Sequence, residues 1–556
     1  MAFGTPGVYV EEVAPQLTSV IQAGTGVCAF LGFTKRGPVH VPIAISNLSD
    51  FKKVFGDSYA NEMGSHAVSG FFDNGGSKAY FVRQGSYNKT SGVDNGATAS
   101  LTIDMEDTTT GTLKFEAGYR GEVSPGVAGN TLSVTVNPAP KFDGAVNEAL
   151  TSEGSANSGT IDLSGTIGIK AGSILELYDS AATATEIHVV QKVETQSDGT
   201  HVIHLVSPLV TTFPILTTTV KTLEYDIQVL DVEGTVIETW TQVSLSNLVT
   251  HNIESVINDP DFGSQFIKVT ATMGTSTGSL ADAIEDNGSL LTGIVLANGT
   301  VEYTGYDKDH FEGTEDIGKG LRALDTISEV NLLSCPPNTS SSVDTWSIKA
   351  TKDFQFRMLE YAKGRMDLFA ILDAPAGLTP VEMKAYRQTT LGLESYWGAL
   401  YYPHLKIQDP ARPLVTATIV VPPSGHVAGI YSRVDGISPP RGGVSAAPAG
   451  VSEFGNVRSV IGIETMISDK QQGTLNPNGV NCIRLLDRAT GGKGVFVFGA
   501  RTLSGDENFK FVSTRRTMTF VEDSVRLSSQ FAVFGKNGAD LWGRLTLVIE
   551  SFLSRF

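Results

Sequence analysis

Two short apolar runs near the start of the chain, 27–31 and 79–82, enclose two stretches with helical spacing. The first stretch predicts a helix over 47–55, and the second predicts a helix that ends at the glycine pair 75–76. Short apolar runs that flank amphipathic helices are typical of buried strands. An α/β arrangement is therefore expected here.

The same pattern returns in the second half of the chain. We predict strands at 330–333 and 368–372, and helices at 321–327, 344–364, 380–393, 515–534 and 538–556. Short, nearly all-apolar strands between longer helices indicate a parallel sheet that helices cover on both faces.

The region between these parts has a different pattern. Residues 91–221 are rich in Thr, Ser and Gly and contain alternating runs such as 132–136 and 201–206. Alternation places apolar side chains on one face of a strand, so short strands separated by turns predict an all-β insertion, a sandwich or small barrel. Helical spacing returns at 248–258, where a helix is predicted.

The predicted fold class is mixed α/β and α+β, with an α/β core formed by the N- and C-terminal parts and an inserted all-β domain. The predicted divisions are an N-terminal arm (1–22), an α/β middle domain (23–90 plus 222–315), a β-rich outer insertion (91–221), a second α/β domain (316–450) and an inner domain (451–556). The arm is predicted to be extended, because Pro6, Gly7 and Pro15 interrupt it and no helical stripe is present.

Charge and composition narrow the function classes. The formal net charge is −18, which argues against nucleic-acid binding, since that needs basic surfaces to meet phosphates. The three cysteines, Cys28, Cys335 and Cys482, are too far apart for metal-ligand spacing, and a disulfide framework is not expected. No apolar run has the length of a membrane span and no secretory signal is visible, so folding in a cytoplasm is expected.

Motifs for catalysis are mostly incomplete. The segment 489–494 lacks the serine or threonine and the earlier glycine of a phosphate loop, and 307–310 lacks the glycine and closing glutamate of a calcium loop, so it is interpreted as a solvated loop. Ser424 and Ser445 are not flanked as in a nucleophile elbow. No enzymatic activity, cofactor or metal site is predicted.

Several strings resemble the contractile tail sheath family. They are Pro6-Gly7-Val8-Tyr9-Val10-Glu11-Glu12-Val13, Gly26-Val27-Cys28-Ala29-Phe30-Leu31-Gly32, Arg36-Gly37-Pro38, Pro125-Gly126-Val127-Ala128-Gly129-Asn130, Val421-Pro422-Pro423-Ser424-Gly425-His426-Val427-Ala428-Gly429-Ile430-Tyr431, Arg433, Asp435, Phe498-Gly499-Ala500-Arg501-Thr502-Leu503, Arg515-Arg516 and Leu541-Trp542. Their shared order, from the start of the chain to its last helix, carries the resemblance.

The chain departs from the family pattern at three places. Ala128 stands where an aromatic residue is usual, and Ser513-Thr514 and Thr517 flank the arginine pair in place of Asn-Val and Leu. Family members normally continue beyond the helix that carries Trp542 into further strands and a C-terminal arm, so the inner domain is expected to be truncated.

The resemblance implies a structural subunit and not an enzyme. Such subunits polymerise helically, or as stacked hexameric rings, around an inner tube, and the sleeve contracts to drive the tube through a cell envelope. The implied partners are further copies of the chain, the inner tube protein, and baseplate and tail terminator proteins, without nucleic acid or membrane insertion. The implied location is a virion tail or injection-machine particle that is assembled in the bacterial host cytoplasm.

The resemblance also assigns the regions and the candidate interaction residues. Residues 316–450 would be the sheath domain and 451–556 the inner, tube-facing domain. An intersubunit arm would comprise Gly7, Val8, Tyr9, Val10, Glu11, Glu12 and Val13, which would add a strand to a neighbour's sheet. Basic residues that would face the tube are Arg515, Arg516, Arg526 and Arg544. An ordinary solvated face, or buried ion pairs of Arg515 and Arg516, are the alternatives for these arginines.

Two other functions remain in competition. A baseplate or fibre protein with a carbohydrate-binding β domain would explain the insertion but not the α/β alternation. A hydrolase with an α/β sheet and a β lid would require a nucleophile or metal cluster, and the motifs above do not supply one.

Overall fold

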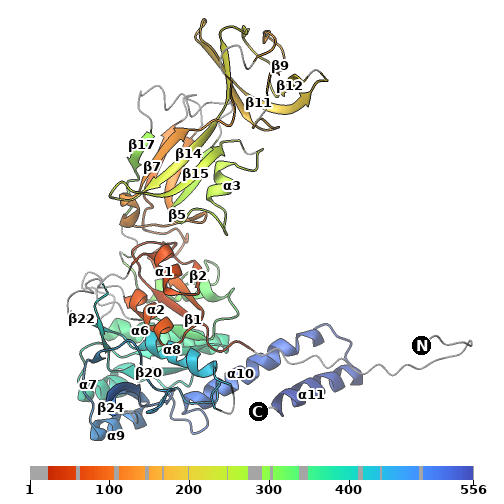
Figure 1. Cartoon of the computed structure of the whole chain (residues 1–556). Helices are drawn as coiled ribbons and strands as arrows, with labels where there is room; N and C mark the ends of the chain where they lie inside the picture. Colours follow the sequence, from red (N-terminus) through yellow and green to blue (C-terminus); the bar gives the residue numbers. More distant parts are fainter. Residues whose placement is uncertain are drawn as a thin grey trace, which may run out of the picture.

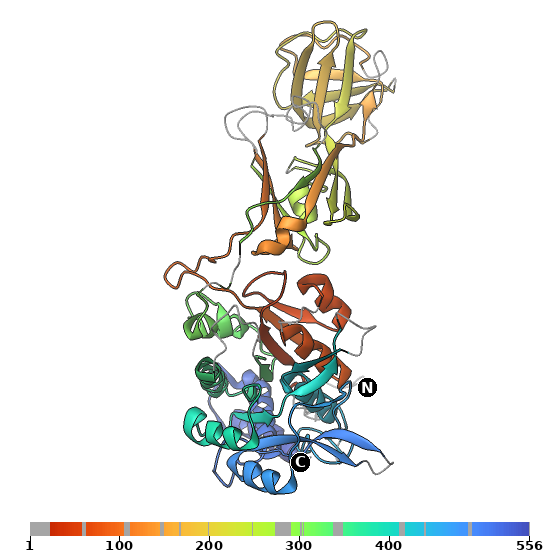
Figure 2. The ribbon, with the colours of Figure 1, turned by 90° about the vertical axis from the view of Figure 1, so that its left-hand side faces the viewer.

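The structure is a computed structural model, and it describes residues 23–57, 63–104, 112–144, 150–165, 168–197, 199–246, 248–272, 291–300, 303, 305–336, 348–410, 417–438, 441–487 and 492–554. Figures 1 and 2 show an elongated molecule in three tiers, which we name the α/β unit, the middle β layers and the distal β domain. Two helices, α10 (Val512–Ser528) and α11 (Ala539–Leu553), extend sideways from the α/β unit.

One eight-stranded sheet forms the centre of the α/β unit in the described part of the chain. Its order is β2 (Pro42–Ile45), β3 (Ala79–Arg83), β1 (Cys28–Gly32), β18 (Leu332–Ser334), β19 (Phe369–Asp373), β20 (Gly398–Tyr402), β24 (Val480–Asp487) and β25 (Lys493–Val497). The six inner strands are parallel, and β2 and β25 are antiparallel to their neighbours. The parallel sheet predicted from the apolar runs is confirmed.

Both faces of this sheet are covered, which explains why its strands are apolar throughout. Along β1, Cys28 and Phe30 enter the core beneath α1 (Leu48–Phe55), α2 (Met63–Asp73) and α8 (Ser424–Asp435). Ala29 and Leu31 enter the opposite core, with side chains from α5 (Lys308–Glu312), α6 (Ile348–Arg365), α7 (Pro380–Ala385) and α9 (Asp469–Leu475).

Local capping sets the helix boundaries. The side chain of Asn47 accepts a hydrogen bond from Asp50 N at 2.8 Å and so caps the start of α1, in agreement with the helix predicted over 47–55. Thr379 and Glu382 form a capping box at the start of α7, where Pro380 occupies the first turn. The predicted helix over 380–393 continues from α7 into a π-helical turn, η4 (Tyr386–Leu391).

Short 3₁₀ segments and a three-stranded sheet complete the α/β unit. They are η2 (Gly320–Leu324), η5 (Asn476–Asn478), η6 (Gln530–Ala532), β22 (Thr418–Val421), β21 (Leu405–Gln408) and β23 (Gly462–Ile463). The helix predicted at 321–327 is therefore a 3₁₀ turn. Helix α8 was not expected, because its side chains are buried almost all round and give no amphipathic stripe.

The middle β layers consist of two antiparallel sheets that enclose one core. One sheet has the order β15 (Val236–Ser244), β14 (Glu224–Leu230), β7 (Ser133–Pro138) and β17 (Leu291–Val295), and the other has β16 (Ile267–Thr272), β5 (Thr112–Tyr119) and β4 (Ser100–Asp104), with β6 (Glu122–Val123) beside β5. The 3₁₀ segment η1 (Val127–Thr131) and the short helix α3 (Ile253–Ile257) belong to this tier; α3 replaces the longer helix predicted at 248–258.

The distal β domain is a single six-stranded sheet around its own core. Its order is β8 (Asp143–Gly144), β13 (Thr218–Thr222), β10 (Ile174–Asp179), β11 (Ala184–Thr195), β12 (His201–Leu205) and β9 (Thr160–Leu163). Leu163, Leu177, Ile203 and Phe213 are almost fully buried in that core.

Strand pairing groups the chain differently from the predicted domains. The insertion 91–221 divides into two tiers, because β7 pairs with β14 in the register Val134 to Val229. Strands of 222–315 thus belong to the middle β layers and not to a unit with 23–90. Likewise, 23–90, 316–450 and the first part of 451–556 share the eight-stranded sheet. Pairing between distant segments decides these boundaries, and no local pattern carries it.

Candidate functional site

Helices α10 and α11 form a pair that stands away from the sheet of the α/β unit (Figure 1). Their contact includes the rings of Phe520 and Phe552, whose centroids are 6.1 Å apart. Within α11 only Val548 and Phe552 are buried, although the helix is rich in apolar residues. Most of its apolar surface therefore has no cover from the described part of this chain.

A group of exposed apolar side chains lies on α11 and in the segment between the two helices. They include Phe531 (39% exposed), Val533 (61%), Phe534 (103%), Trp542 (59%), Leu547 (46%) and Leu553 (46%). Grouped exposure of large apolar side chains is typical of a protein–protein contact surface. We call these six residues the α10–α11 apolar surface.

Arg516 anchors α10 to the α/β unit. Its guanidinium donates to both carboxylate oxygens of Asp435 at 2.8 and 2.5 Å and to the carbonyl oxygen of Thr25 at 2.8 Å. The guanidinium carbon also lies 4.8 Å from the ring centroid of Tyr431. Burial raises the pKa of Asp435, and the adjacent Arg516 opposes that rise. The contact joins three segments that are far apart in the sequence.

Arg515 is also buried, on the other side of α10. Its guanidinium carbon lies 4.3 Å from the ring centroid of Trp397, and Nη2 donates to Glu522 Oε2 at 2.6 Å. The prediction that Arg515 and Arg516 face a tube is therefore wrong for the described structure. The alternative, in which both arginines form buried ion pairs inside the chain, is what the structure contains, since they are only 3% and 5% exposed.

Arg526 and Arg544 are exposed, and their predicted contact with a tube stays a prediction. Arg526 forms an ion pair with Asp523 within α10, and the Arg544 guanidinium carbon lies 5.1 Å from the ring centroid of Phe531. Both are thus available to a partner at the edge of the α10–α11 apolar surface. The intersubunit-arm residues from Gly7 to Val13 lie outside the described residues.

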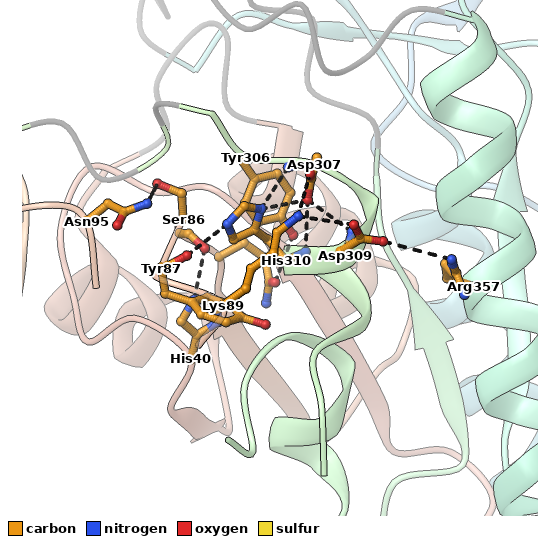
Figure 3. Close-up of polar contacts among 12 residues, drawn as sticks. His40, Ser86, Tyr87, Lys89, Asn95, Tyr306, Asp307, Asp309, His310 and Arg357 are labelled. Atoms are coloured by element: carbon orange, nitrogen blue, oxygen red, sulfur yellow. Dashed lines mark hydrogen bonds and ion pairs between the residues drawn. The ribbon is translucent and has the colours of Figure 1, made fainter. Parts of the chain in front are cut away.

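A second polar cluster lies where the chain leaves the α/β unit for the β tiers and returns from them (Figure 3). On the outgoing segment, Lys89 Nζ donates to Asp307 Oδ2 at 2.7 Å and to Asp309 Oδ2 at 3.1 Å on the returning segment. His310 Nε2 donates to the Tyr87 carbonyl oxygen at 2.9 Å. Arg357 of α6 pairs with Glu312 at 2.6 Å. The two connections are therefore bound to each other and to the unit.

Burial and hydrogen bonding set the charges in this cluster. Burial lowers the pKa of His40 to about 3, and its ring donates to the Gly85 carbonyl oxygen at 2.9 Å, so the imidazole is neutral. Burial alone would raise the pKa of Asp307, but hydrogen bonds from Lys89 and His310 lower it to about 2. At neutral pH the His40 imidazole is therefore neutral and the Asp307 carboxylate is ionised.

The sequence interpretation of 307–310 as a solvated loop is wrong. Asp307 caps α5 through the backbone N–H groups of Asp309 and His310, and the His310 side chain is 6% exposed. An aspartate that precedes an apolar position by a few residues is a helix N-cap signal that could have revealed this.

Arg83 connects the middle β layers to the α/β unit, and no sequence motif indicated this role. It is fully buried at the end of β3 and donates to the carbonyl oxygens of Thr34 at 3.1 Å, Gly37 at 2.7 Å and Pro125 at 2.8 Å. Pro125 and Gly37 belong to two strings of the resemblance. These strings are therefore in contact through one buried side chain.

Metal-binding clusters and membrane-spanning helices are absent from the described ranges. No group of three or more His, Cys, Asp or Glu side chains could hold a metal ion there. No described helix combines the length and apolar character that a membrane crossing would require.

The solved structures that this chain resembles include sheath proteins of contractile tails and of a contractile injection system, and baseplate structures of the anti-feeding prophage. The contracted helical sheath of the anti-feeding prophage aligns with 16% identity over 100% of this chain and 84% of that one, at a TM-score of 0.44. The sheath tail protein of Desulfitobacterium hafniense aligns with 12% identity over 99% and 88%, at 0.49, and that of Listeria innocua with 10% identity over 92% and 77%, at 0.46. No family model and no curated protein matches.

Proposed function

We propose that this chain is a structural subunit of a contractile sheath, which assembles with further copies of itself around an inner tube and contracts to drive that tube through a cell envelope. The observation that carries the proposal is the junction at Arg516. It joins three of the strings in the sheath resemblance: the arginine pair 515–516, the segment that ends at Asp435, and the segment that begins near Gly26.

The α10–α11 apolar surface supplies the assembly contact in this proposal. A helical sleeve requires heterologous contacts, in which two different patches meet, because a self-complementary patch closes into a dimer. Exposed Phe534 and Trp542 supply an apolar centre, and the exposed Arg544 over the Phe531 ring supplies a positive charge beside it. The remainder of the protein is acidic, with a net charge of −18, so this positive charge favours contact with an acidic neighbour.

The finer assignments are part of the same proposal. The partner of Arg526 and Arg544 would be the inner tube, the arm at Gly7–Val13 would add a strand to a neighbouring subunit, and baseplate and terminator proteins would bind the two ends of the sleeve. The particle would be a virion tail or an injection machine assembled in the bacterial cytoplasm. The role is mechanical, with energy held in subunit packing and not supplied by catalysis.

Negative-stain electron microscopy of the purified full chain, combined with light scattering, tests the proposal. Hollow cylinders with a ring repeat are expected, and Trp542→Ala with Phe534→Ser should reduce their number. The exposed pair Val206→Ser and Val210→Ser in the distal β domain is the matched control. Closed dimers that persist at high protein concentration would refute the proposed heterologous contact.

A further inference from the structure

A second feature of the α/β unit has no part in the proposed assembly contact: the buried arginine Arg387. This residue lies on the π-helical turn η4, which follows α7 and ends at Gly392 in the left-handed conformation, with φ of 56°. Single π-helical turns occur frequently at functional sites. The turn positions the Arg387 side chain against Leu503 from the segment after β25.

The guanidinium of Arg387 is poorly satisfied. The residue is 9% exposed, and Nη2 donates to the Leu503 carbonyl oxygen at 2.6 Å. Its Nε is buried and has no hydrogen-bond partner. No carboxylate among the described residues comes within ion-pair distance of it, whereas the buried arginines Arg484, Arg515 and Arg516 each have one. A buried cation without a counterion destabilises the folded state, because the free energy lost when its charge leaves water is offset only by an ion pair or hydrogen bonds.

An open pocket lies beside this guanidinium. It has a volume of about 340 Å³ and is lined by Arg387, Gln388 and Glu394 from one side and by Asn478, Gly479 and Ser504 from the other. The amide of Gln388 donates to Asn478 Oδ1 at 2.9 Å and so joins the two walls. The walls are polar and mostly neutral, and this volume is sufficient for a small anion with some of its water.

We infer that this pocket binds an oxyanion, a phosphate or carboxylate group, through the guanidinium of Arg387. The planar guanidinium presents several N–H donors, and these match the oxygens of a carboxylate or phosphate. Burial lowers the pKa of Arg387, which is consistent with a cation that lacks its counterion, and Glu394 acts in the opposite direction. Glu394 is exposed on the pocket wall and is the nearest competing charge.

Inorganic phosphate added to the full chain tests this inference. Isothermal titration and thermal unfolding, with chloride at matched ionic strength as the reference, should give saturable binding and a raised unfolding midpoint. Arg387→Met should abolish both effects. The matched control is Arg365→Met: that arginine is also buried but is paired with Asp367 at 2.8 Å, so its loss should lower stability and leave phosphate binding intact.

Glu394→Gln provides a test that does not disturb the core, because the side chain is exposed. Removing this negative charge should strengthen phosphate binding about two- to fivefold, because it removes the repulsion between the Glu394 carboxylate and the bound phosphate. That repulsion is weak, since solvent and salt screen charges that are not in contact. A purely structural Arg387 would give no such change. Absence of saturable binding, or equal binding by the wild type and Arg387→Met, would overturn the inference.

The same chemistry could come from a free anion or from a carboxylate of a second copy of the chain. Light scattering with and without phosphate separates these sources. Phosphate that binds without changing the particle size identifies a free anion as the ligand. Phosphate that dissociates assemblies, as Arg387→Met would also do, identifies the carboxylate of a second copy.

Discussion

Arg516→Met removes one member of a buried ion pair and leaves the other in place. The side chains of Arg516 and Asp435 are 6% and 3% exposed, and their contact is bidentate. Methionine keeps most of the apolar stem, so the loss is mainly electrostatic. Breaking a buried pair from one side costs about 3–5 kcal/mol, because the remaining charge is left without compensation.

The structure predicts where this loss appears. Arg516 joins α10 to the end of α8 and to the Thr25 carbonyl oxygen, and it has no contact with the β tiers. Hydrogen exchange measured by mass spectrometry should therefore be about two to four decades faster in α10 and the end of α8, the factor that 3–5 kcal/mol implies. Peptides of the distal β domain should be unchanged and serve as an internal reference.

A matched variant and a second-site change sharpen the result. Arg526→Met breaks a pair on the same helix in which the arginine side chain is 53% and the aspartate side chain 13% exposed, so it should cost less than Arg516→Met, about 1 kcal/mol. Asp435→Asn in the Arg516→Met background should restore part of the lost protection, because it removes the unpaired buried charge. Equal effects of Arg516→Met and Arg526→Met would refute the anchoring role of Arg516.

Three further predictions concern other parts of the molecule. Burial raises the pKa of Asp373 to about 7. Between about pH 4 and 7 this carboxyl group is therefore ionised in the unfolded state but protonated in the folded state, and the free energy of unfolding falls as the pH rises through this window. Asp373→Asn should remove that slope in pH-dependent urea unfolding and stabilise the protein above pH 7 by at most about 4 kcal/mol; an unchanged slope would contradict this. Phe213→Ala should destabilise the distal β domain by about 3–5 kcal/mol. Because the core of this domain is separate from the other cores, calorimetry should show a shift of one unfolding transition only, and a shift of every transition would contradict the prediction. Arg83→Met should increase exchange at 124–126, where the Pro125 carbonyl loses its donor, and unchanged exchange there would contradict the proposed connection.

The sequence determined the secondary-structure types of the α/β unit. Runs such as 27–31 and 368–372 are short and apolar because both faces of a parallel strand are covered, and this pattern is visible without a structure. The cap at Asn47 depends on residues three positions apart and was equally predictable. The ordered strings also led to the contractile sheath resemblance, since each string is local.

Tertiary structure alone decided which segments pair and which charges are buried. The pairing of β7 with β14 places the strands between 224 and 295 in the middle β layers, and such long-range pairing leaves no local trace. Arg515 and Arg526 look equivalent in the sequence of α10, yet one is enclosed by Trp397 and the other is exposed. That Arg387 is buried and has no carboxylate partner among the described residues is likewise visible only in three dimensions, because both facts depend on every segment packed around the side chain.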